Sequence, residues 1–183
     1  DSALLFAALC GERPIDLKET SLAGTRLAIL CAGVINDVRD APSKAFDQSI
    51  EALKKAGAQV QEITLECVSE AMSLTEFLFN AEAYGTWKKT IEKQPYLMFN
   101  KILDRFRGGA DIKGSDYVAA WRRLEILRKT YQKATQGYDA ILCPTSPIVP
   151  PNAARLLTDE DYYVTENLLA LRNTRVGNLL DLC

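Results

Sequence analysis

The chain has no histidine at any of its 183 positions. Catalytic groups that use histidine as a base, such as Ser-His-Asp and Cys-His, are therefore excluded within this sequence. The five cysteines also lack Cys-x-x-Cys spacing. Together, the two absences argue against a Cys/His metal site, and we expect no metal.

Long apolar runs are missing as well. No stretch approaches the roughly 18 consecutive apolar residues that a membrane-spanning helix needs, and no basic segment followed by an apolar one indicates a signal peptide. The cysteine count is odd, and several cysteines lie inside apolar stretches. We therefore expect buried free thiols rather than disulfides, and a cytoplasmic protein without membrane contact.

No sign of charge dominates the sequence. Lysine and arginine number 22 against 24 acidic residues, which gives a net charge of −2. Nucleic-acid-binding proteins concentrate basic residues on one face, and here acids and bases are interspersed. One basic group is predicted to be the solvated face of a helix rather than a nucleic-acid patch: Arg122, Arg123, Arg128, Lys129 and Lys133. The composition, 48 % apolar and 25 % charged, is that of a globular domain.

A strand–helix–strand pattern occupies residues 26–65. Residues 26–31 form a short continuous apolar run, typical of a strand covered on both faces. Apolar residues then recur at helical spacing between 42 and 57, and residues 60–65 alternate weakly. The pattern predicts an α/β fold with a parallel βαβ unit. The turn at 31–36 is not Gly-x-Gly-x-x-Gly, so a phosphate-binding loop there has little support.

The middle of the chain has a helical pattern. One helix is expected from Ser69 to Lys93, and Pro95 is expected to open a second. A third should be capped by Ser115 or Asp116. An apolar stripe runs along this helix at Tyr117, Trp121, Leu124, Leu127 and Tyr131.

Both ends of the chain have informative patterns. Residues 2–10 predict a short apolar helix that ends at Gly11. Residues 138–143 predict a buried strand, and four prolines stiffen the loop at 144–151. Residues 165–182 form either a helix that ends at Asn178 or a helix that runs into a strand.

The sequence contains no recognisable nucleophile. A serine without histidine would need a lysine as its base, yet none of the eight serines lies in a Gly-x-Ser-x-Gly or Ser-x-x-Lys context. Ser43 and Lys44 are adjacent, but neighbours on a helix do not face each other. The acidic residues at 159–161 are contiguous and unflanked by apolar residues, so we expect them to be solvated rather than catalytic.

Six segments, taken together, resemble the amidase signature family. They are Gly24–Ile29, Ala52–Val60, Ala81–Tyr84, Arg107–Tyr117, Tyr138–Pro147 and Arg172–Leu182. The most distinctive is Tyr-Asp-Ala-Ile-Leu-Cys-Pro-Thr-Ser-Pro at 138–147, which is similar to a strand and loop of that family. Each segment taken alone is only a modest match. Six matching segments in the same order as in the family are a specific indication of it, and together they extend over nearly the whole chain.

This resemblance implies a mixed β-sheet between helical layers. It also implies cleavage of a carboxamide C–N bond, or release of ammonia from glutamine as in the glutamyl-tRNA amidotransferases. The family uses a Ser–cis-Ser–Lys triad and a Gly/Ser-rich loop, and both precede the segments matched here. We therefore expect the triad upstream of Asp1, a fragment truncated at both ends, and no activity from this chain alone. No cofactor is implied.

Five residues are placed near the substrate by the same resemblance. Tyr84 lies where the family's helix approaches the substrate, and Arg105 and Arg107 lie where some members hold a substrate carboxylate. A guanidinium suits that task because it offers a planar fork of donors. The alternative is that both arginines are ordinary solvent-facing charges, and their spacing lets at most one face a given pocket. Thr145 and Ser146 either line the substrate tunnel or bond to the backbone of their own loop.

The resemblance also suggests a division of the single domain portion. Residues 26–65 would form the βαβ unit, 66–136 a helical substrate-side region, and 138–183 a strand, a proline-rich loop and a terminal helix or strand. Expected partners are a small-molecule amide and either a second copy or the remainder of the enzyme; neither nucleic acid nor membrane is indicated. The alternative function is a non-catalytic α/β ligand-binding module or a pseudo-enzyme domain, since fold does not dictate function.

Overall fold

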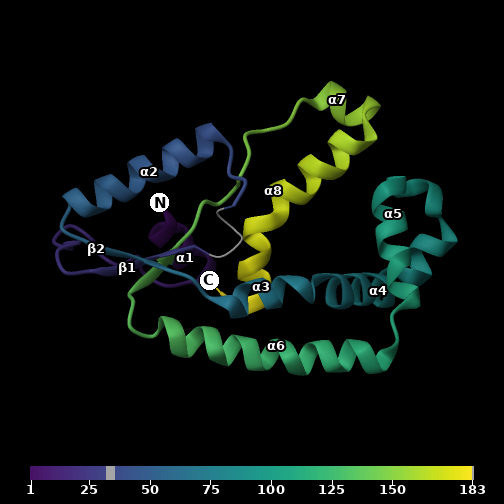
Figure 1. The fold of residues 1–183 in the computed structure, drawn as a ribbon, viewed down its shortest axis with the longest axis horizontal. Coiled ribbons are helices and arrows are strands. Elements are labelled where there is room, and N and C mark those ends of the chain that lie inside the picture. The colour runs from purple at the N-terminus through teal and green to yellow at the C-terminus, as the bar shows by residue number, and fades with distance from the viewer. Residues whose placement is uncertain (32–35, 183) are drawn as a thin grey trace.

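A small sheet lies at one end of the molecule and long helices extend from it (Figure 1). This computed structural model describes residues 1–31 and 36–182, so most of the turn considered for phosphate binding, and Cys183, lie outside the described residues. The elements are α1 (Ser2–Cys10), β1 (Arg26–Leu30), α2 (Asp40–Lys55), β2 (Gln59–Ile63), α3 (Glu66–Ser73), η1 (Glu76–Asn80), α4 (Ala81–Lys93), η2 (Pro95–Leu97), α5 (Asn100–Arg107), η3 (Gly108–Asp111), α6 (Gly114–Thr135), β3 (Ala140–Leu142), α7 (Ala153–Thr158) and α8 (Glu160–Leu180).

The three described strands pair in parallel in the order β2-β1-β3. Leu27 of the central strand lies opposite both Val60 and Ala140. Because β1 has a neighbour on each side, its residues Leu27, Ala28 and Leu30 are buried. The strand predicted over 138–143 is present as β3, but it has only three residues, and the prediction that it is buried was wrong. Its residues are exposed or half-buried, because β3 lies at the edge of the sheet.

Two polar residues fix the start of β3 against the rest of the sheet. The Asp139 carboxylate accepts a hydrogen bond from the Arg26 backbone N–H at 2.7 Å, and the Asp139 N–H donates to the Arg26 carbonyl at the same distance. The Tyr138 hydroxyl donates to Gln61 Oε1 of β2 at 3.0 Å. The Tyr-Asp pair that opens the distinctive segment therefore ties all three strands together.

The helical middle is more interrupted than its pattern predicts. The helix expected from Ser69 begins at Glu66 and passes through the π-helical turn η1 before α4. Pro95 opens only the short 3₁₀ turn η2, and α5 begins at Asn100. Prolines fit a first helical turn, but Met98 and Phe99 are extended and stop η2 from continuing into α5.

The expected cap of α6 was also wrong. The helix begins at Gly114, which places Ser115 and Asp116 inside its first turn, and its N-cap residue Lys113 makes no side-chain capping bond. Ser115 Oγ instead lies 3.4 Å from the Asp116 carboxylate. The apolar stripe of α6 is confirmed, since all five of its residues belong to or pack against the main core.

That core lies between α3, α6 and α8. Val68, Leu124, Leu179 and Leu180 are each only 1 % exposed. The open question at the C-terminal end is settled in favour of a helix, because α8 continues to Leu180. Two of the five basic residues on α6 are not merely solvated: Arg123 pairs with Glu70, and Arg128 Nε donates to the Leu179 carbonyl at 2.8 Å.

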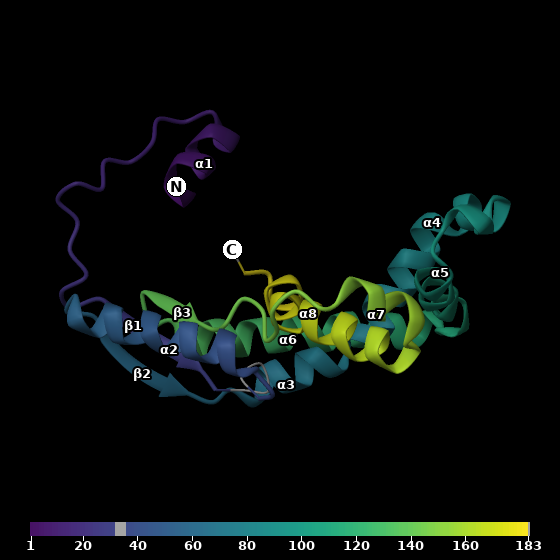
Figure 2. The same ribbon diagram turned by 90° about the horizontal axis from the view of Figure 1, so that it is seen from above.

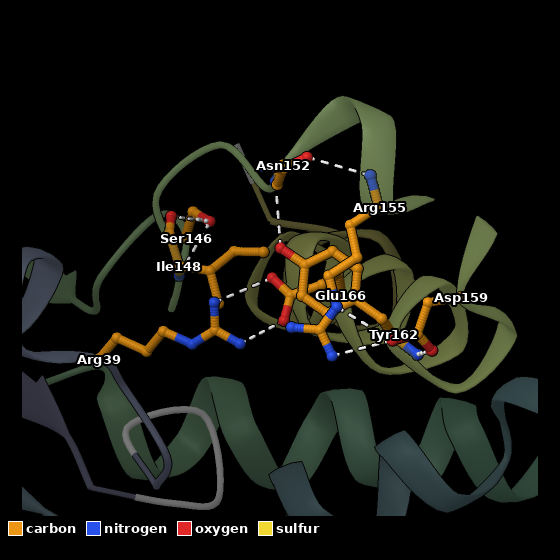
Figure 3. Close-up of polar contacts among 8 residues, drawn as sticks. All are labelled: Arg39, Ser146, Ile148, Asn152, Arg155, Asp159, Tyr162 and Glu166. Atoms are coloured by element: carbon orange, nitrogen blue, oxygen red, sulfur yellow. Dashed lines mark hydrogen bonds and ion pairs between the residues drawn. The ribbon is translucent and has the colours of Figure 1, made fainter. Parts of the chain in front are cut away.

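Side chains cap the two C-terminal helices. Asn152 Oδ1 accepts from the Arg155 N–H and Asp159 Oδ1 from the Tyr162 N–H, both at 3.0 Å (Figure 3). The acidic run at 159–161 was predicted to be solvated, yet its first member caps α8. The bond from Tyr162, aided by Arg155, lowers the pKa of the Asp159 carboxyl, because both favour the charged form.

The first helix stands apart from the rest of the molecule (Figure 2). It ends as predicted at Gly11, whose φ of 69° is left-handed.

Four cysteines, Cys10, Cys31, Cys67 and Cys143, are free thiols, and Cys67 is buried. Across the described ranges, we found no helix both long and apolar enough to cross a membrane.

Candidate functional site

A cavity of about 510 Å³ opens between α3, η1, α5 and α8. Its apolar wall includes Met72, Phe79, Leu168 and Leu171. Its polar groups include Glu76, Asn80, Arg105, Thr174, Arg175 and Asn178. An apolar pocket with a few convergent polar groups is the usual form of a small-molecule site.

Two guanidinium groups from different helices share this cavity. Arg105 lies on α5, where its Nη2 donates to Asn167 Oδ1 at 3.1 Å. Arg175 lies on α8 and is half-buried. Burial, followed by the positive charge of Arg105, lowers the pKa of the Arg175 guanidinium below its usual range. The site therefore has a positive character that suits an anionic group.

Arg107 does not line the same cavity. Its Nε donates to Glu92 Oε1 at 3.0 Å and its Nη2 to Glu92 Oε2 at 2.8 Å. This bidentate pair links the end of α5 to α4 and raises the pKa of the Arg107 guanidinium. The divergence of Arg105 and Arg107 agrees with their two-residue spacing.

Tyr84 lines a separate hollow of about 640 Å³ with Gly109 and Tyr117. The Lys88 ammonium lies 5.5 Å from the centre of the Tyr84 ring, within the range of a cation–π contact. Tyr84 and Arg105 thus face different hollows.

Thr145 and Ser146 lie in the loop after β3 and are absent from the residues that line the Arg105 cavity. Thr145 is exposed. Ser146 Oγ donates to the Ile148 carbonyl at 3.1 Å and accepts from the Ile148 N–H at 3.4 Å (Figure 3). Of the two alternatives for Ser146, the structure shows the bond to its own loop.

The pairing of Arg39 with Glu166 is a feature that sequence reasoning missed (Figure 3). The Glu166 side chain is 1 % exposed, and Arg39 Nη1 donates to its Oε2 at 2.9 Å while Nη2 donates to Oε1. The Arg39 N–H also donates to the Pro147 carbonyl at 2.9 Å. Both charges are satisfied, so the pair joins α2, the proline-rich loop and α8 rather than offering a binding site.

Arg175 lines the cavity, and sequence reasoning did not single it out. It belongs to the matched segment Arg172–Leu182, which carried no expectation for this side chain. Leu168, Leu171 and Arg175 follow one another at spacings of three and four, which places them on one face of a helix. That spacing would have been the signal, once α8 was known to be a helix facing a cavity.

The hydroxyl groups at the cavity have no activating base in the described part of the chain. Ser73 and Thr75 line the cavity, but their hydroxyls donate to the Glu70 and Met72 carbonyls. None of the serine hydroxyls is hydrogen-bonded to a lysine amine across residues 1–31 and 36–182. Burial raises the pKa of the Cys67 and Cys143 thiols, and a raised pKa disfavours the reactive thiolate. Within the same ranges, no group of three or more Cys, Asp or Glu side chains could hold a metal ion.

Comparison with known proteins gives the relatives of the chain. The family model described as "Amidase" matches residues 10–182. A 2-amino-5-chloromuconic acid deaminase from Comamonas testosteroni is 26 % identical over 193 aligned residues, which cover 100 % of this chain and 40 % of that protein. The A subunit of a glutamyl-tRNA(Gln) amidotransferase from Alkaliphilus metalliredigens is 26 % identical over 132 residues, covering 59 % and 27 %.

Solved structures show the same fold. A crystal structure of an amidase superposes with a TM-score of 0.72 at 20 % identity, covering 98 % of this chain and 41 % of that one. The A subunit of the glutamyl-tRNA(Gln) amidotransferase from Thermotoga maritima gives 0.64 at 18 % identity, covering 91 % and 35 %. The chain spans about two fifths or less of the length of these relatives. Because the family model matches nearly every residue, the chain belongs to the amidase family, with an α/β fold of the amidase type.

Proposed function

We propose that this chain is part of an amide hydrolase that cleaves a carboxamide C–N bond, and that it supplies the substrate-pocket scaffold. The observation that carries the proposal is the cavity lined by Arg105 in a chain of the amidase family. Relatives named as a deaminase and as part of an amidotransferase support chemistry at a C–N bond. The cavity gives such an enzyme an apolar surface and a cation with which to hold its substrate.

The nucleophile is proposed to lie in a part of the protein that this sequence does not contain. The family resemblance implies a Ser–cis-Ser–Lys triad, and the described residues bring no serine to a lysine. The matched relatives are more than twice as long as this chain, which leaves room for the triad elsewhere. This chain would then act together with the remainder of the enzyme and would be inactive alone.

Arg105 is the residue that we retain for direct contact with the substrate. Its guanidinium faces the cavity and has one described acceptor, the Asn167 amide oxygen. Four further N–H donors remain on the guanidinium group, enough to hold a carboxylate with two parallel bonds. Arg107 is occupied by Glu92, and Ser146 by its own loop. The substrate is accordingly proposed to be an amide that also carries a carboxylate.

Ammonia release by the full-length protein tests the proposal. We expect turnover of succinamate, which has one carboxylate and one amide, and no turnover by the 183-residue chain alone. Arg105→Gln should raise KM for succinamate about 10- to 100-fold, because it removes charge-assisted hydrogen bonds. Arg122→Gln, on the exposed side of α6, is the matched control and should leave KM unchanged.

Two results would contradict this function. Hydrolysis of simple amides by the isolated chain would place the nucleophile among its own residues. Tight binding of succinamate to the full-length protein without ammonia release would favour the alternative, a ligand-binding or pseudo-enzyme domain on the same fold. We also propose a reducing compartment, the cytoplasm, on the basis of the free thiols of Cys31, Cys67 and Cys143.

A further inference from the structure

Arg175 is a half-buried arginine whose charge is not balanced by a carboxylate in the described part of the chain. Five other arginines each hold a carboxylate in an ion pair: Arg26 with Asp139, Arg39 with Glu166, Arg107 with Glu92, Arg123 with Glu70 and Arg155 with Asp159. Arg175 is half-buried, yet it has no carboxylate partner and no hydrogen-bond acceptor among residues 1–31 and 36–182. A partly desolvated cation without a partner is costly to the fold.

A second cation shares the cavity with Arg175. Arg105 faces it from α5, and its positive charge adds to the effect of burial in lowering the pKa of the Arg175 guanidinium. Glu76 also lines the cavity, but it forms no ion pair with either arginine in the described part of the chain. Two like charges that share a hollow repel each other. An anion bound in the cavity would reduce this repulsion.

The surroundings of the two arginines indicate the kind of anion. Leu168 and Leu171 precede Arg175 on the same face of α8, so a hydrocarbon wall adjoins the cations. Arginine forks match the two oxygens of a carboxylate. A small organic acid therefore fits the cavity better than an inorganic anion, which would gain nothing from the apolar wall.

We propose that Arg175 is a second specificity-determining residue that binds the substrate carboxylate together with Arg105, so that the enzyme prefers monoamides of short dicarboxylic acids to neutral amides. The inference rests on the proposed amide hydrolase function. It goes further in two respects. It assigns Arg175 to the substrate site, so that two guanidiniums hold the carboxylate. It also predicts a preference for carboxylate-bearing amides that one arginine would give only weakly.

Binding of succinate to the full-length protein tests the site without any need for turnover. Titration calorimetry should show about 10- to 100-fold weaker binding to Arg175→Gln, the range expected for loss of a charge-assisted pair. Arg175→Lys keeps the charge but loses the planar fork. Its affinity for succinate should therefore lie between that of the unmodified protein and that of Arg175→Gln. Arg122→Gln should bind as the unmodified protein does. Equal affinity in all variants, or binding of inorganic phosphate in preference to succinate, would overturn the proposal.

Kinetics separate this inference from the proposed function. For succinamate, Arg175→Gln should lower kcat/KM mainly through KM, whereas for the neutral diamide succinamide kcat/KM should not fall. An equal loss on both amides would show that Arg175 does not select the carboxylate. Failure of the unmodified protein to release ammonia from either amide would defeat the proposed function, and succinate binding would still decide the role of Arg175.

Thermal unfolding distinguishes a binding role from a structural one. Removal of an unneutralised cation relieves repulsion and desolvation, so Arg175→Gln should melt at the same temperature as the unmodified protein or higher. A lower melting temperature with unchanged succinate affinity would assign Arg175 to the fold instead. If Arg175→Gln did not fold, Arg175→Lys would decide, since succinate affinity equal to that of the unmodified protein would contradict the inference.

Discussion

Among single residues, Gly109 permits a close approach between backbone segments in the helical region. A Cβ atom built on it would lie 2.0 Å from the Asn80 carbonyl oxygen and 2.9 Å from the Tyr84 Cβ. Both distances are far below van der Waals contact. The turn η3 can therefore pack against η1 and α4 only because position 109 has no side chain.

We expect Gly109→Ala to destabilise the protein by about 3 kcal/mol, the upper range for overpacking, because backbone rather than a flexible side chain would have to move. Gly85→Ala is the matched control. Gly85 lies inside α4 with open space around it, so alanine should stabilise the helix by up to about 1 kcal/mol. Urea denaturation measures both free energies of unfolding. Similar stabilities for the two variants would show that the close approach is absent in solution.

The candidate site shows what a sequence reveals about single residues. The spacing of Arg105 and Arg107 was enough to predict that at most one faces a given pocket, because side-chain direction on a helix is local. Ion pairing is not local in the sequence. Arg107 pairs with Glu92 at a sequence separation of 15 residues, and Arg39 pairs with Glu166 at a separation of 127. The isolation of Arg175 could not be predicted, since it depends on which carboxylates the whole fold places elsewhere.

Among the elements, α8 supplies five of the twelve residues that line the candidate site. Three contacts fix the position of this helix. Glu166 binds Arg39, the buried Asn173 Nδ2 donates to the Pro144 carbonyl at 2.7 Å, and the Leu179 carbonyl accepts from Arg128 at 2.8 Å. These partners precede α2, follow β3 and lie on α6. The placement of Arg175 at the cavity therefore depends on contacts from both the sheet end and the helical end of the molecule.

We expect Arg39→Met to lower the melting temperature by several degrees, because it leaves the Glu166 carboxylate buried without a cation. The double variant Arg39→Met/Glu166→Leu should recover most of the loss, since an apolar pair of similar volume replaces both charges. Arg123→Met disrupts an ion pair whose two side chains are partly exposed, and should change the melting temperature far less. A double variant no more stable than Arg39→Met alone would contradict the account.

The helices and strands could be predicted from the sequence only where a local residue pattern determines them. The stripe on α6 and the glycine that ends α1 follow from helical periodicity and from glycine's access to left-handed backbone. The exposure of β3 could not be predicted from local pattern, because the same apolar run is compatible with a strand inside a sheet and with one at its edge. The π-helical turn η1 also escaped prediction; it packs against η3 and α6 rather than following a local signal.

In the whole molecule, stability is distributed unevenly. The core between α3, α6 and α8 lies next to the sheet, whereas α1 lies apart from it (Figure 2). The side chains of Leu4, Leu5, Phe6 and Leu9 are all more than half exposed, and Leu9 reaches 80 %. Such an apolar helix gains little from the rest of this chain. At nine residues it is also shorter than the roughly 12 to 15 residues an isolated helix needs for stability in water.

Hydrogen exchange on the 183-residue chain should therefore divide the molecule. The amides of α1 should exchange almost as fast as an unfolded peptide, while those of α6 should exchange only on global unfolding, because local opening energies follow burial.

A matched pair of substitutions should show the same contrast between α1 and α6 in the free energy of unfolding. Leu124→Ala, at a side chain 1 % exposed, should cost about 2 to 5 kcal/mol. Leu9→Ala should cost no more than about 0.5 kcal/mol. If α1 were protected as strongly as α6, or if Leu9→Ala cost as much as Leu124→Ala, α1 would have to be packed on the core in solution, and the separation of the two would be wrong.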